Sequence, residues 1–207
     1  CNDNGRGYLS LNNYDEIMEK IEWADSLVIG PGLGLEKDTI RLVSKLVNTI
    51  DKPIVLDADG LASFSFLKSN LDNLVITPHL GEFSKILNID KKILLNDFIQ
   101  IVKSFMTDFP GVAIIKHVPV CIINGQKMSL NSTGNPGLAT AGTGDVLSGV
   151  VASFISQNMN VYDACRLSSY FHGLAADNQI KHKGVRGLIA SDLPLEIAKV
   201  INEYENL

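Results

Sequence analysis

The sequence predicts an α/β domain with a mainly parallel sheet and an antiparallel edge. Short apolar runs alternate with longer stretches of helical periodicity along most of the chain. Two further short runs are separated by an Asn-Gly pair, which is typical of a hairpin turn. With 45% hydrophobic and 20% charged residues, the 207-residue chain can bury a substantial core.

Four continuously apolar runs indicate parallel strands that are covered on both faces, at 26–29, 53–56, 73–76 and 112–115. The runs at 120–123 and 127–130 are predicted to form a hairpin around Asn124-Gly125. Helices are predicted at 36–48, 81–88, 91–107, 145–157, 161–180 and 192–204, the last with Ser191 as its N-cap. No repeat or linker interrupts this pattern, so we expect a single domain.

Charge and cysteine usage exclude several classes of protein. The net charge is −5 and no more than two Lys or Arg residues are adjacent, which gives no basic surface for nucleic acid. Cys1, Cys121 and Cys165 are widely spaced, which argues against a disulfide framework or a zinc site and favours the cytoplasm. No apolar run reaches the roughly 18 residues of a membrane span, and we expect no membrane partner.

Residues suited to chemistry follow the predicted strands, where open α/β sheets bind ligands. The first strand ends in Gly30-Pro-Gly-Leu-Gly34, which fits neither the Walker pattern nor GxGxxG and alternatively only turns the chain. Asp57 and Asp59 follow the second strand. Two carboxylates at this spacing suit magnesium, but they also suit a turn or a helix cap.

The third strand is followed by Thr77, His79 and Glu82 at the start of a predicted helix. The imidazole of His79 is placed to contact a substrate, and the carboxylate of Glu82 to hold magnesium through water. Alternatively, Thr77 and Glu82 cap the helix.

Three other basic side chains carry weaker signals. Lys116 follows the fourth strand, where it either reaches a phosphate or extends its ammonium group into solvent. His172 lies in an apolar helical pattern that is typical of a core residue. His182 is flanked by lysines and is expected in a solvated turn.

The strongest signal is the glycine-rich run that ends in Ala141-Gly-Thr-Gly144 and precedes a helix. Backbone N–H groups and about half a positive charge from the helix dipole favour a phosphate there. We expect Gly144 to approach that phosphate closely and to need a positive φ. Asp145 is then predicted to be the general base that takes a proton from a hydroxyl attacking the phosphate. The alternative is an ordinary acidic residue at a helix N-terminus.

Five motifs occur in the order and spacing of the ADP- or ATP-dependent NAD(P)H-hydrate dehydratases, a branch of the ribokinase-like superfamily. They are IGPGLG, PIVLDADGL, ITPHLGEFSKI, NPGLATAGTGDVLSGVV and GLIASDL. The sequence resembles this family over nearly its whole length. His79-Leu-Gly-Glu82 also resembles the N-x-x-E magnesium motif of the superfamily, with His in place of Asn.

The resemblance implies a ribokinase-like three-layer α/β/α domain and a repair reaction. Family enzymes phosphorylate the hydroxyl of NADH or NADPH hydrate with ADP or ATP in the presence of Mg²⁺, and loss of phosphate restores NAD(P)H. Gly34, His79 and Asp145 match the family's contacts to the hydrate. The expected nucleotide contacts are Lys116, His117, Val118, Pro119, Val120 and Gly144, to which the anion site adds Ala141, Gly142 and Thr143.

Two departures from the family pattern shape these expectations. Family members usually have Lys-Gly followed shortly by Thr where this chain has 116–120, so backbone contacts to the nucleotide are expected there. The family's opening strand, Gly-rich turn and Ala-rich helix have no counterpart before the NGRGYLS segment at 4–10. We therefore expect residues 1–207 to be one catalytic domain that lacks its N-terminal strand-helix portion.

The resemblance further implies a homo-oligomer, a tetramer in the family, and a hydrate epimerase that is fused or separate. Two other functions stay open from the residues. One is a small-molecule kinase of the same superfamily, acting on a thiamine precursor or a sugar. The other is a nucleotide-binding module without catalytic activity.

Overall fold

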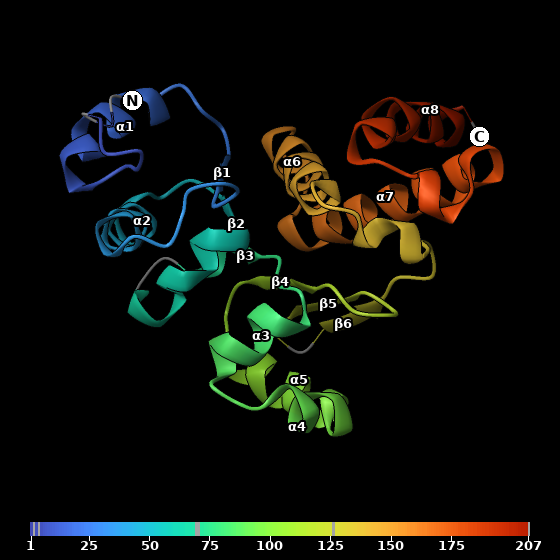
Figure 1. The fold of residues 1–207 in the computed structure, drawn as a ribbon, viewed down its shortest axis with the longest axis horizontal. Helices are drawn as coiled ribbons and strands as arrows, with labels where there is room; N and C mark the ends of the chain where they lie inside the picture. Colours follow the sequence, from blue (N-terminus) through green and yellow to red (C-terminus); the bar gives the residue numbers. More distant parts are fainter. Residues whose placement is uncertain (2, 4, 69–70, 126, 207) are drawn as a thin grey trace.

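The chain folds into three layers, with a sheet between two layers of helices (Figure 1). The structure is a computed structural model that describes residues 1, 3, 5–68, 71–125 and 127–206. The strands lie across the sheet in chain order: β1 (Leu27–Ile29), β2 (Ile54–Leu56), β3 (Leu74–Ile76), β4 (Val112–Ile115), β5 (Cys121–Asn124) and β6 (Lys127–Leu130). The first four are parallel and the last two antiparallel, which confirms the predicted fold class.

The helices divide between the two faces of the sheet. Their bounds are α1 (Tyr14–Ile21), α2 (Lys37–Thr49), α3 (Leu80–Leu87), α4 (Lys91–Asn96), α5 (Phe98–Asp108), α6 (Thr143–Ser156), α7 (Val161–Lys183) and α8 (Leu193–Glu205). The first five lie on one face, whereas α6 and α7 cover the other and α8 packs on α7. In the described part of the chain, no helix is long and apolar enough to cross a membrane.

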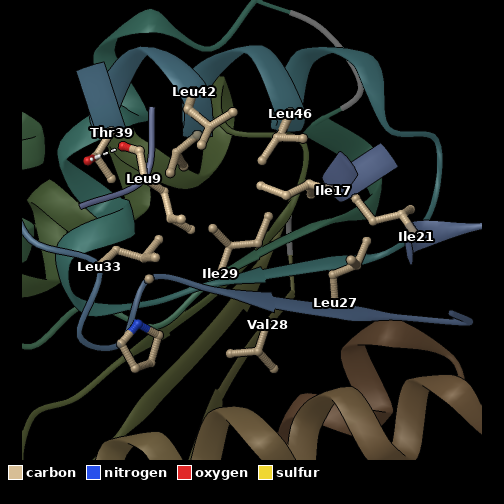
Figure 2. Close-up of a pocket in the computed structure, with 13 residues that line it drawn as sticks. Leu9, Ile17, Ile21, Leu27, Val28, Ile29, Leu33, Thr39, Leu42 and Leu46 are labelled. Carbon is tan, nitrogen blue, oxygen red and sulfur yellow. Dashed lines mark hydrogen bonds between the residues drawn. The ribbon is translucent and has the colours of Figure 1, made fainter. Parts of the chain in front are cut away.

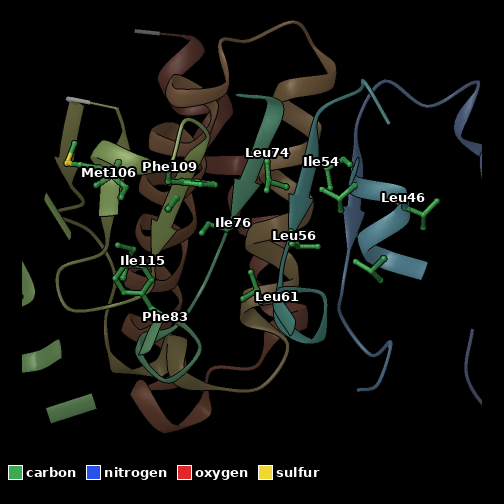
Figure 3. Close-up of a cluster of buried hydrophobic side chains, with 14 of the residues drawn as sticks. Leu46, Ile54, Leu56, Leu61, Leu74, Ile76, Phe83, Met106, Phe109 and Ile115 are labelled. Carbon is green, nitrogen blue, oxygen red and sulfur yellow. The ribbon is translucent and has the colours of Figure 1, made fainter. Parts of the chain in front are cut away.

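Successive strand residues supply the two cores, because side chains of a strand alternate between the faces of the sheet. Leu56, Ile76 and Ile115 point to the face covered by α2, α3 and α5 (Figure 3). Val55 and Val75 point to the opposite face, against α6 and α7. Burial on both faces explains why these strands are continuously apolar in sequence.

The hairpin turn lies one residue later than predicted. Asn124 belongs to β5 and pairs with Lys127, so the connection begins at Gly125, and position 126 lies outside the described residues. The side-chain amide of Asn124 donates to the carbonyl oxygens of Pro110 and Gly111 at 3.3 and 3.1 Å. These bonds favour a strand position for Asn124 over a turn position.

Helix boundaries differ from the prediction in three places. The helix predicted at 91–107 is divided into α4 and α5 at Asp97, whose φ of −118° and ψ of 27° are not helical. The residue at the N-cap of α8 is Asp192 and not Ser191, because a 3-10 turn at Ala190–Asp192 precedes the helix, which begins at Leu193. The Asp192 carboxylate does not cap α8 but accepts the Ile189 N–H at 3.1 Å and pairs with Lys183. Helix α7 continues to Lys183 and does not end at 180, so His182 lies in its last turn and not in a turn after it, although it is exposed as expected.

Helix α1 was not predicted, and a distant lysine stabilises its end. The ammonium group of Lys52 donates to the carbonyl oxygens of Ile21, Glu22 and Ala24 at 2.8, 2.7 and 2.6 Å. A cation at a helix C-terminus satisfies carbonyl groups that have no partner within the helix. The helix thus depends on a contact from far along the chain.

Strand β1 is an edge strand of the described sheet and borders an apolar cavity. Among the described residues it pairs with β2 alone. The cavity has a volume of about 380 Å³ and is lined mostly by leucine and isoleucine side chains of α1, α2 and β1 (Figure 2). Val28 points to the other side of the strand and is 39% exposed. Apolar surface therefore remains accessible on both sides of β1.

Candidate active site

The carboxyl ends of the parallel strands bring three candidate residues to one edge of the sheet. Asp57 directly follows β2, Thr77 follows β3 and Lys116 follows β4. A bridge between His79 and Lys116 continues the pairing of β3 and β4 beyond the strands. There the Lys116 N–H donates to the Pro78 carbonyl oxygen at 2.8 Å. This edge is where open α/β sheets bind ligands.

Asp57 lies at the centre of a buried polar network. Its Oδ1 accepts from Lys116 Nζ at 2.9 Å, and its Oδ2 accepts from Ser148 Oγ at 2.8 Å. Burial alone would raise the pKa of this carboxyl group. The charge of Lys116 and hydrogen bonds from Thr77, Lys116 and Ser148 outweigh that effect and hold the Asp57 pKa below its usual value.

Asp57 and Asp59 do not form an open pair of carboxylates. Asp57 also accepts the N–H of Ala58 at 2.9 Å and caps a 3-10 helix that spans Ala58–Phe66. Asp59 instead accepts the N–H of Gly34 at 2.9 Å. Within the described ranges, no group of three His, Cys, Asp or Glu side chains could hold a metal ion. The arrangement favours the turn-and-cap interpretation of this pair.

The glycines after β1 lie in two different environments: Gly30 is packed against another segment, and Gly34 is exposed. A β-carbon on Gly30 would lie 1.7 Å from the Asp57 carbonyl oxygen, so a side chain cannot be accommodated there. Gly34, expected to contact the hydrate, is exposed and has a φ of +79° that favours glycine. Gly30 is thus required for packing against the backbone after β2, whereas a ligand contact at Gly34 stays a prediction.

The N-terminus of α6 presents unpaired backbone donors. Gly142 is the N-cap residue, with a φ of +85°. The positive φ therefore occurs at Gly142, and the expectation of one at Gly144 was wrong. No described residue accepts the backbone N–H of Gly144 or Asp145. These groups and the positive end of the helix dipole lie where the anion site is predicted, with Ala141 exposed beside them, and phosphate binding there stays a prediction.

Asp145 lies on the first turn of α6 and its side chain is free. It is exposed, and it forms no hydrogen bond or ion pair with any residue that the structure describes. An acidic residue whose only role was to stabilise the N-terminus of α6 would occupy the same position. A free carboxylate beside unpaired N–H groups is also what a base at an anion site requires.

Thr143 faces away from the anion site. Its hydroxyl donates to the carbonyl oxygens of Leu138 and Thr140 at 2.7 and 2.9 Å. Its own carbonyl oxygen accepts from His172 Nε2 at 2.9 Å. Burial lowers the pKa of His172 to about 4, an effect that the Thr143 bond opposes and the charge of Lys116 increases. His172 is therefore a neutral core residue, as predicted.

His79 and Glu82 cap α3 reciprocally. His79 Nδ1 accepts the N–H groups of Gly81 and Glu82 at 3.0 and 3.1 Å, and Glu82 Oε2 accepts the His79 N–H at 2.8 Å. The capping alternative is thus correct for Glu82, but the partner is His79, because Thr77 is buried near Ser148. His79 Nε2 lies 3.4 Å from Glu82 Oε1, and the His79 side chain remains 60% exposed, so its ring is accessible to a ligand.

The segment after β4 contains a ring contact that sequence reasoning missed. The ring of His117 stacks on Phe98, with centroids 4.8 Å apart and planes at 22°. Its Nδ1 is buried and has no partner among the described residues. Val118 and Pro119 are exposed beside it, which leaves this segment accessible.

Sequence reasoning also missed the roles of Ser148 and Asp57 at this edge. Ser148 is three positions after the exposed Asp145 on α6, so helical spacing places the two residues on the same side of the helix and does not predict the burial of Ser148. Nothing in the sequence indicates that its partner is an aspartate after β2. That contact depends on how α6 packs across the sheet.

The fold and the site together define a ribokinase-like α/β domain. A solved ADP/ATP-dependent NAD(P)H-hydrate dehydratase from Bacillus subtilis, co-crystallized with ATP/Mg²⁺, matches with a TM-score of 0.79 and 27% identity. The match covers 87% of this chain and 65% of that chain. A hydroxyethylthiazole kinase from Pyrococcus horikoshii shares the fold alone, with a TM-score of 0.67 and 18% identity over 91% of this chain and 75% of its own.

A model of the family described as NAD(P)H-hydrate dehydratase matches residues 7–199, and the chain belongs to that family. A bifunctional NAD(P)H-hydrate repair enzyme from Moorella thermoacetica is 35% identical over 193 residues. The match covers 90% of this chain and 36% of that enzyme. The chain thus spans little more than a third of this curated relative.

Proposed function

We propose that the chain catalyses the dehydration of NAD(P)H hydrate to NAD(P)H with ADP or ATP as co-substrate. It would then be a lyase of nicotinamide-nucleotide repair that releases phosphate together with AMP or ADP. Family membership over residues 7–199 and the printed activity of the Bacillus subtilis relative support this proposal.

The observation that carries the proposal is the free carboxylate of Asp145 beside unpaired backbone donors. The N–H groups of Gly144 and Asp145 have no acceptor among the described residues, and Lys116 lies against the same turn of α6. Backbone donors and an ammonium group stabilise the charge of a transferring phosphoryl group. The carboxylate can accept the proton that the attacking hydroxyl must lose.

In the proposed reaction the hydroxyl oxygen of the hydrate forms a bond to the terminal phosphorus of the nucleotide. The bond from that phosphorus to the bridging oxygen breaks, and AMP or ADP leaves with the electron pair. Asp145 takes the hydroxyl proton. The carbon–oxygen bond of the phosphorylated hydrate then breaks, phosphate leaves with the electron pair, and loss of a ring proton restores NAD(P)H.

The remaining site residues are proposed to bind the two substrates. Gly34 and His79 contact the hydrate together with Asp145. The nucleotide lies along the segment after β4 and the N-terminus of α6. Its proposed contacts are Lys116, His117, Val118, Pro119, Val120, Ala141, Gly142 and Gly144. Thr143 is no longer among them, because it is buried and its hydroxyl and N–H groups both donate within the chain.

Glu82 suits an indirect contact to Mg²⁺. Its carboxylate is partly exposed, and Oε2 already accepts the His79 N–H at 2.8 Å, which leaves lone pairs for a water. Magnesium keeps several waters and binds through one or two carboxylates and substrate phosphates. We therefore propose that Glu82 holds Mg²⁺ through water, and the ion would neutralise phosphate charge when bound.

Location and partners are proposed on other grounds. Three unpaired cysteines, two of them buried, support a reducing cytoplasm. The name of the Moorella relative describes it as bifunctional, which supports a hydrate epimerase as a fused or separate partner. A homo-oligomer, as a tetramer, is proposed on the family resemblance.

The test is a turnover assay of the full natural chain on NADH hydrate and NADPH hydrate, each with ADP or ATP. We expect reduced nicotinamide and free phosphate in equal amounts, with no stable phosphorylated product. A phosphorylated product without free phosphate would identify a small-molecule kinase instead. Binding of ADP without turnover on any hydrate would indicate a catalytically silent module.

A further inference from the structure

Asp57 joins four elements of the fold at a single carboxylate. It follows β2, and it is bonded to Lys116 after β4, to Ser148 on α6 and to Thr77 after β3. Only 1% of its surface is exposed. The carboxylate therefore cannot contact a substrate directly, and any part it plays in the site acts through its partners.

Of these partners, Lys116 alone extends toward the anion site. Its ammonium group is 2.9 Å from Asp57 Oδ1, and its side chain is 24% exposed. A β-carbon on Gly144 would lie 3.3 Å from Lys116 Nζ and 3.8 Å from Asp57 Oδ2. The ion pair thus lies directly below the first turn of α6.

A lysine side chain has a flexible stem, and holding its charge at one point costs conformational entropy. A partner that fixes the ammonium group in advance removes part of that cost from ligand binding. Asp57 is itself fixed, because Ser148 and Ala58 also donate to it. The carboxylate therefore holds the Lys116 ammonium group beside the N-terminus of α6.

We propose that Asp57 is a positioning residue that holds the Lys116 ammonium group against the N-terminus of α6, where it meets the phosphates of the nucleotide. This inference rests on the proposed function only in taking an adenine nucleotide as the ligand. It assigns a role to a residue that touches neither substrate.

Removal of the carboxylate charge distinguishes positioning from simple electrostatics. Asp57→Asn removes a negative charge near the phosphates, so a purely electrostatic role predicts tighter binding of ADP. Positioning predicts the opposite, a loss of about tenfold in affinity, the size of one charge-assisted hydrogen bond. Titration calorimetry measures whether Asp57→Asn raises or lowers the affinity for ADP, and tighter binding would overturn the proposal.

A double variant tests whether Asp57 acts through Lys116. In a Lys116→Met background, Asp57→Asn should no longer weaken ADP binding, because no ammonium group remains to be held. An equal loss in both backgrounds would show that Asp57 acts independently, and would contradict the proposal. Ser148→Ala keeps both charges and provides a milder variant if Asp57→Asn does not fold. It should weaken ADP binding by about threefold, again only when Lys116 is present.

An experiment that needs no nucleotide tests this inference independently of the proposed function. We would measure how fast an amine-selective acylating reagent modifies Lys116, with the exposed Lys92 as an internal reference. Asp57→Asn, or Ser148→Ala to a smaller extent, should accelerate modification of Lys116 and leave Lys92 unchanged. If the unsubstituted chain binds no ADP, the proposed function fails while these rates still decide whether Asp57 holds Lys116. Unchanged rates would overturn the inference.

Discussion

Gly144 lies against the ammonium group of Lys116, so closely that a β-carbon on Gly144 would be 3.3 Å from Nζ. A contact of that length is tighter than ordinary packing, and a side chain there would displace the lysine. The relationship connects the first turn of α6 to the end of β4. A glycine at this position leaves room for the Lys116 ammonium group beside the first turn of α6.

Gly144→Val should therefore weaken nucleotide binding and turnover together. The added side chain occupies the space beside Lys116 and narrows the approach to the unpaired N–H groups. We expect at least a tenfold loss of ADP affinity, about 1.4 kcal/mol, measured by titration calorimetry. Gly149→Val is the matched control, because a β-carbon at Gly149 on the same helix meets nothing within 4 Å. Unaltered ADP affinity in Gly144→Val would mean that the phosphates bind elsewhere.

Asp145→Asn separates catalysis from binding. The side chain keeps its size and loses its capacity to take a proton, so ADP affinity should stay nearly unchanged. Turnover of the hydrate by the full natural chain should fall by on the order of 10² to 10⁴, the usual contribution of a general base. The control is Asp163→Asn, which alters an exposed acid on the first turn of α7. If Asp145→Asn kept wild-type turnover, Asp145 would not be the general base and would only stabilise the N-terminus of α6.

His79→Asn tests why a histidine can replace the Asn of the N-x-x-E motif. Nδ1 of His79 accepts two N–H groups at the start of α3, as the side-chain oxygen of an N-cap Asn would. His79→Ala should lower the free energy of unfolding by about 1 kcal/mol, whereas His79→Asn should preserve it. Chemical denaturation measures both. Equal losses in the two variants would show that Asn does not replace the histidine cap, and no loss in His79→Ala would show that the cap contributes nothing to stability.

The sequence was sufficient to predict the parallel part of the sheet and the helix that follows the glycine-rich run. Strands β2, β3 and β4 are buried on both faces, so their apolar runs are continuous and easily recognised. The glycines before Asp145 mark a helix N-terminus by composition alone. Local patterns such as these do not depend on contacts with distant segments.

Long-range contacts were beyond sequence reasoning. Asp57 and Lys116 are separated by 59 positions, and only the parallel pairing of β2, β3 and β4 brings their side chains together. The bond from Lys52 to the end of α1 is of the same kind. Asn124 shows a smaller failure, since its bonds to the chain before β4 shift the hairpin turn by one residue.

His172 should make stability depend on pH. Burial lowers its pKa from 6.5 to about 4, so the unfolded chain binds its proton more readily than the folded one. The contribution of the neutral ring is complete above about pH 6.5, and is lost as the pH falls from about 6.5 to about 4. Linkage gives a total of about 3 kcal/mol over this range.

Denaturation midpoints of His172→Gln at several pH values test this dependence. Glutamine keeps an N–H donor for the Thr143 carbonyl oxygen and does not titrate, so stability should vary less between pH 6.5 and 4. His182→Gln changes an exposed histidine on the same helix and should leave the wild-type dependence in place. An identical pH profile for wild type and His172→Gln would contradict the assignment.

Strand β1 presents an accessible apolar edge in the described sheet. Val28 is 39% exposed, β1 pairs with β2 alone within the described ranges, and an apolar cavity of about 380 Å³ borders the strand. An open apolar edge strand promotes pairing between chains. The cavity is also lined by Gly30, Pro31 and Leu33, which lead to the proposed hydrate contact at Gly34.

We therefore predict that the 207 residues expressed alone are insoluble or inactive. A version preceded by the opening strand, Gly-rich turn and helix of a dehydratase family member should be soluble and restore NADH from its hydrate. The added strand would pair with β1, and its side chains would cover the cavity and complete the approach to Gly34. Size-exclusion chromatography and the turnover assay compare the two forms. A monodisperse 207-residue protein that repairs the hydrate as fast as the extended form would show that the edge needs no further segment.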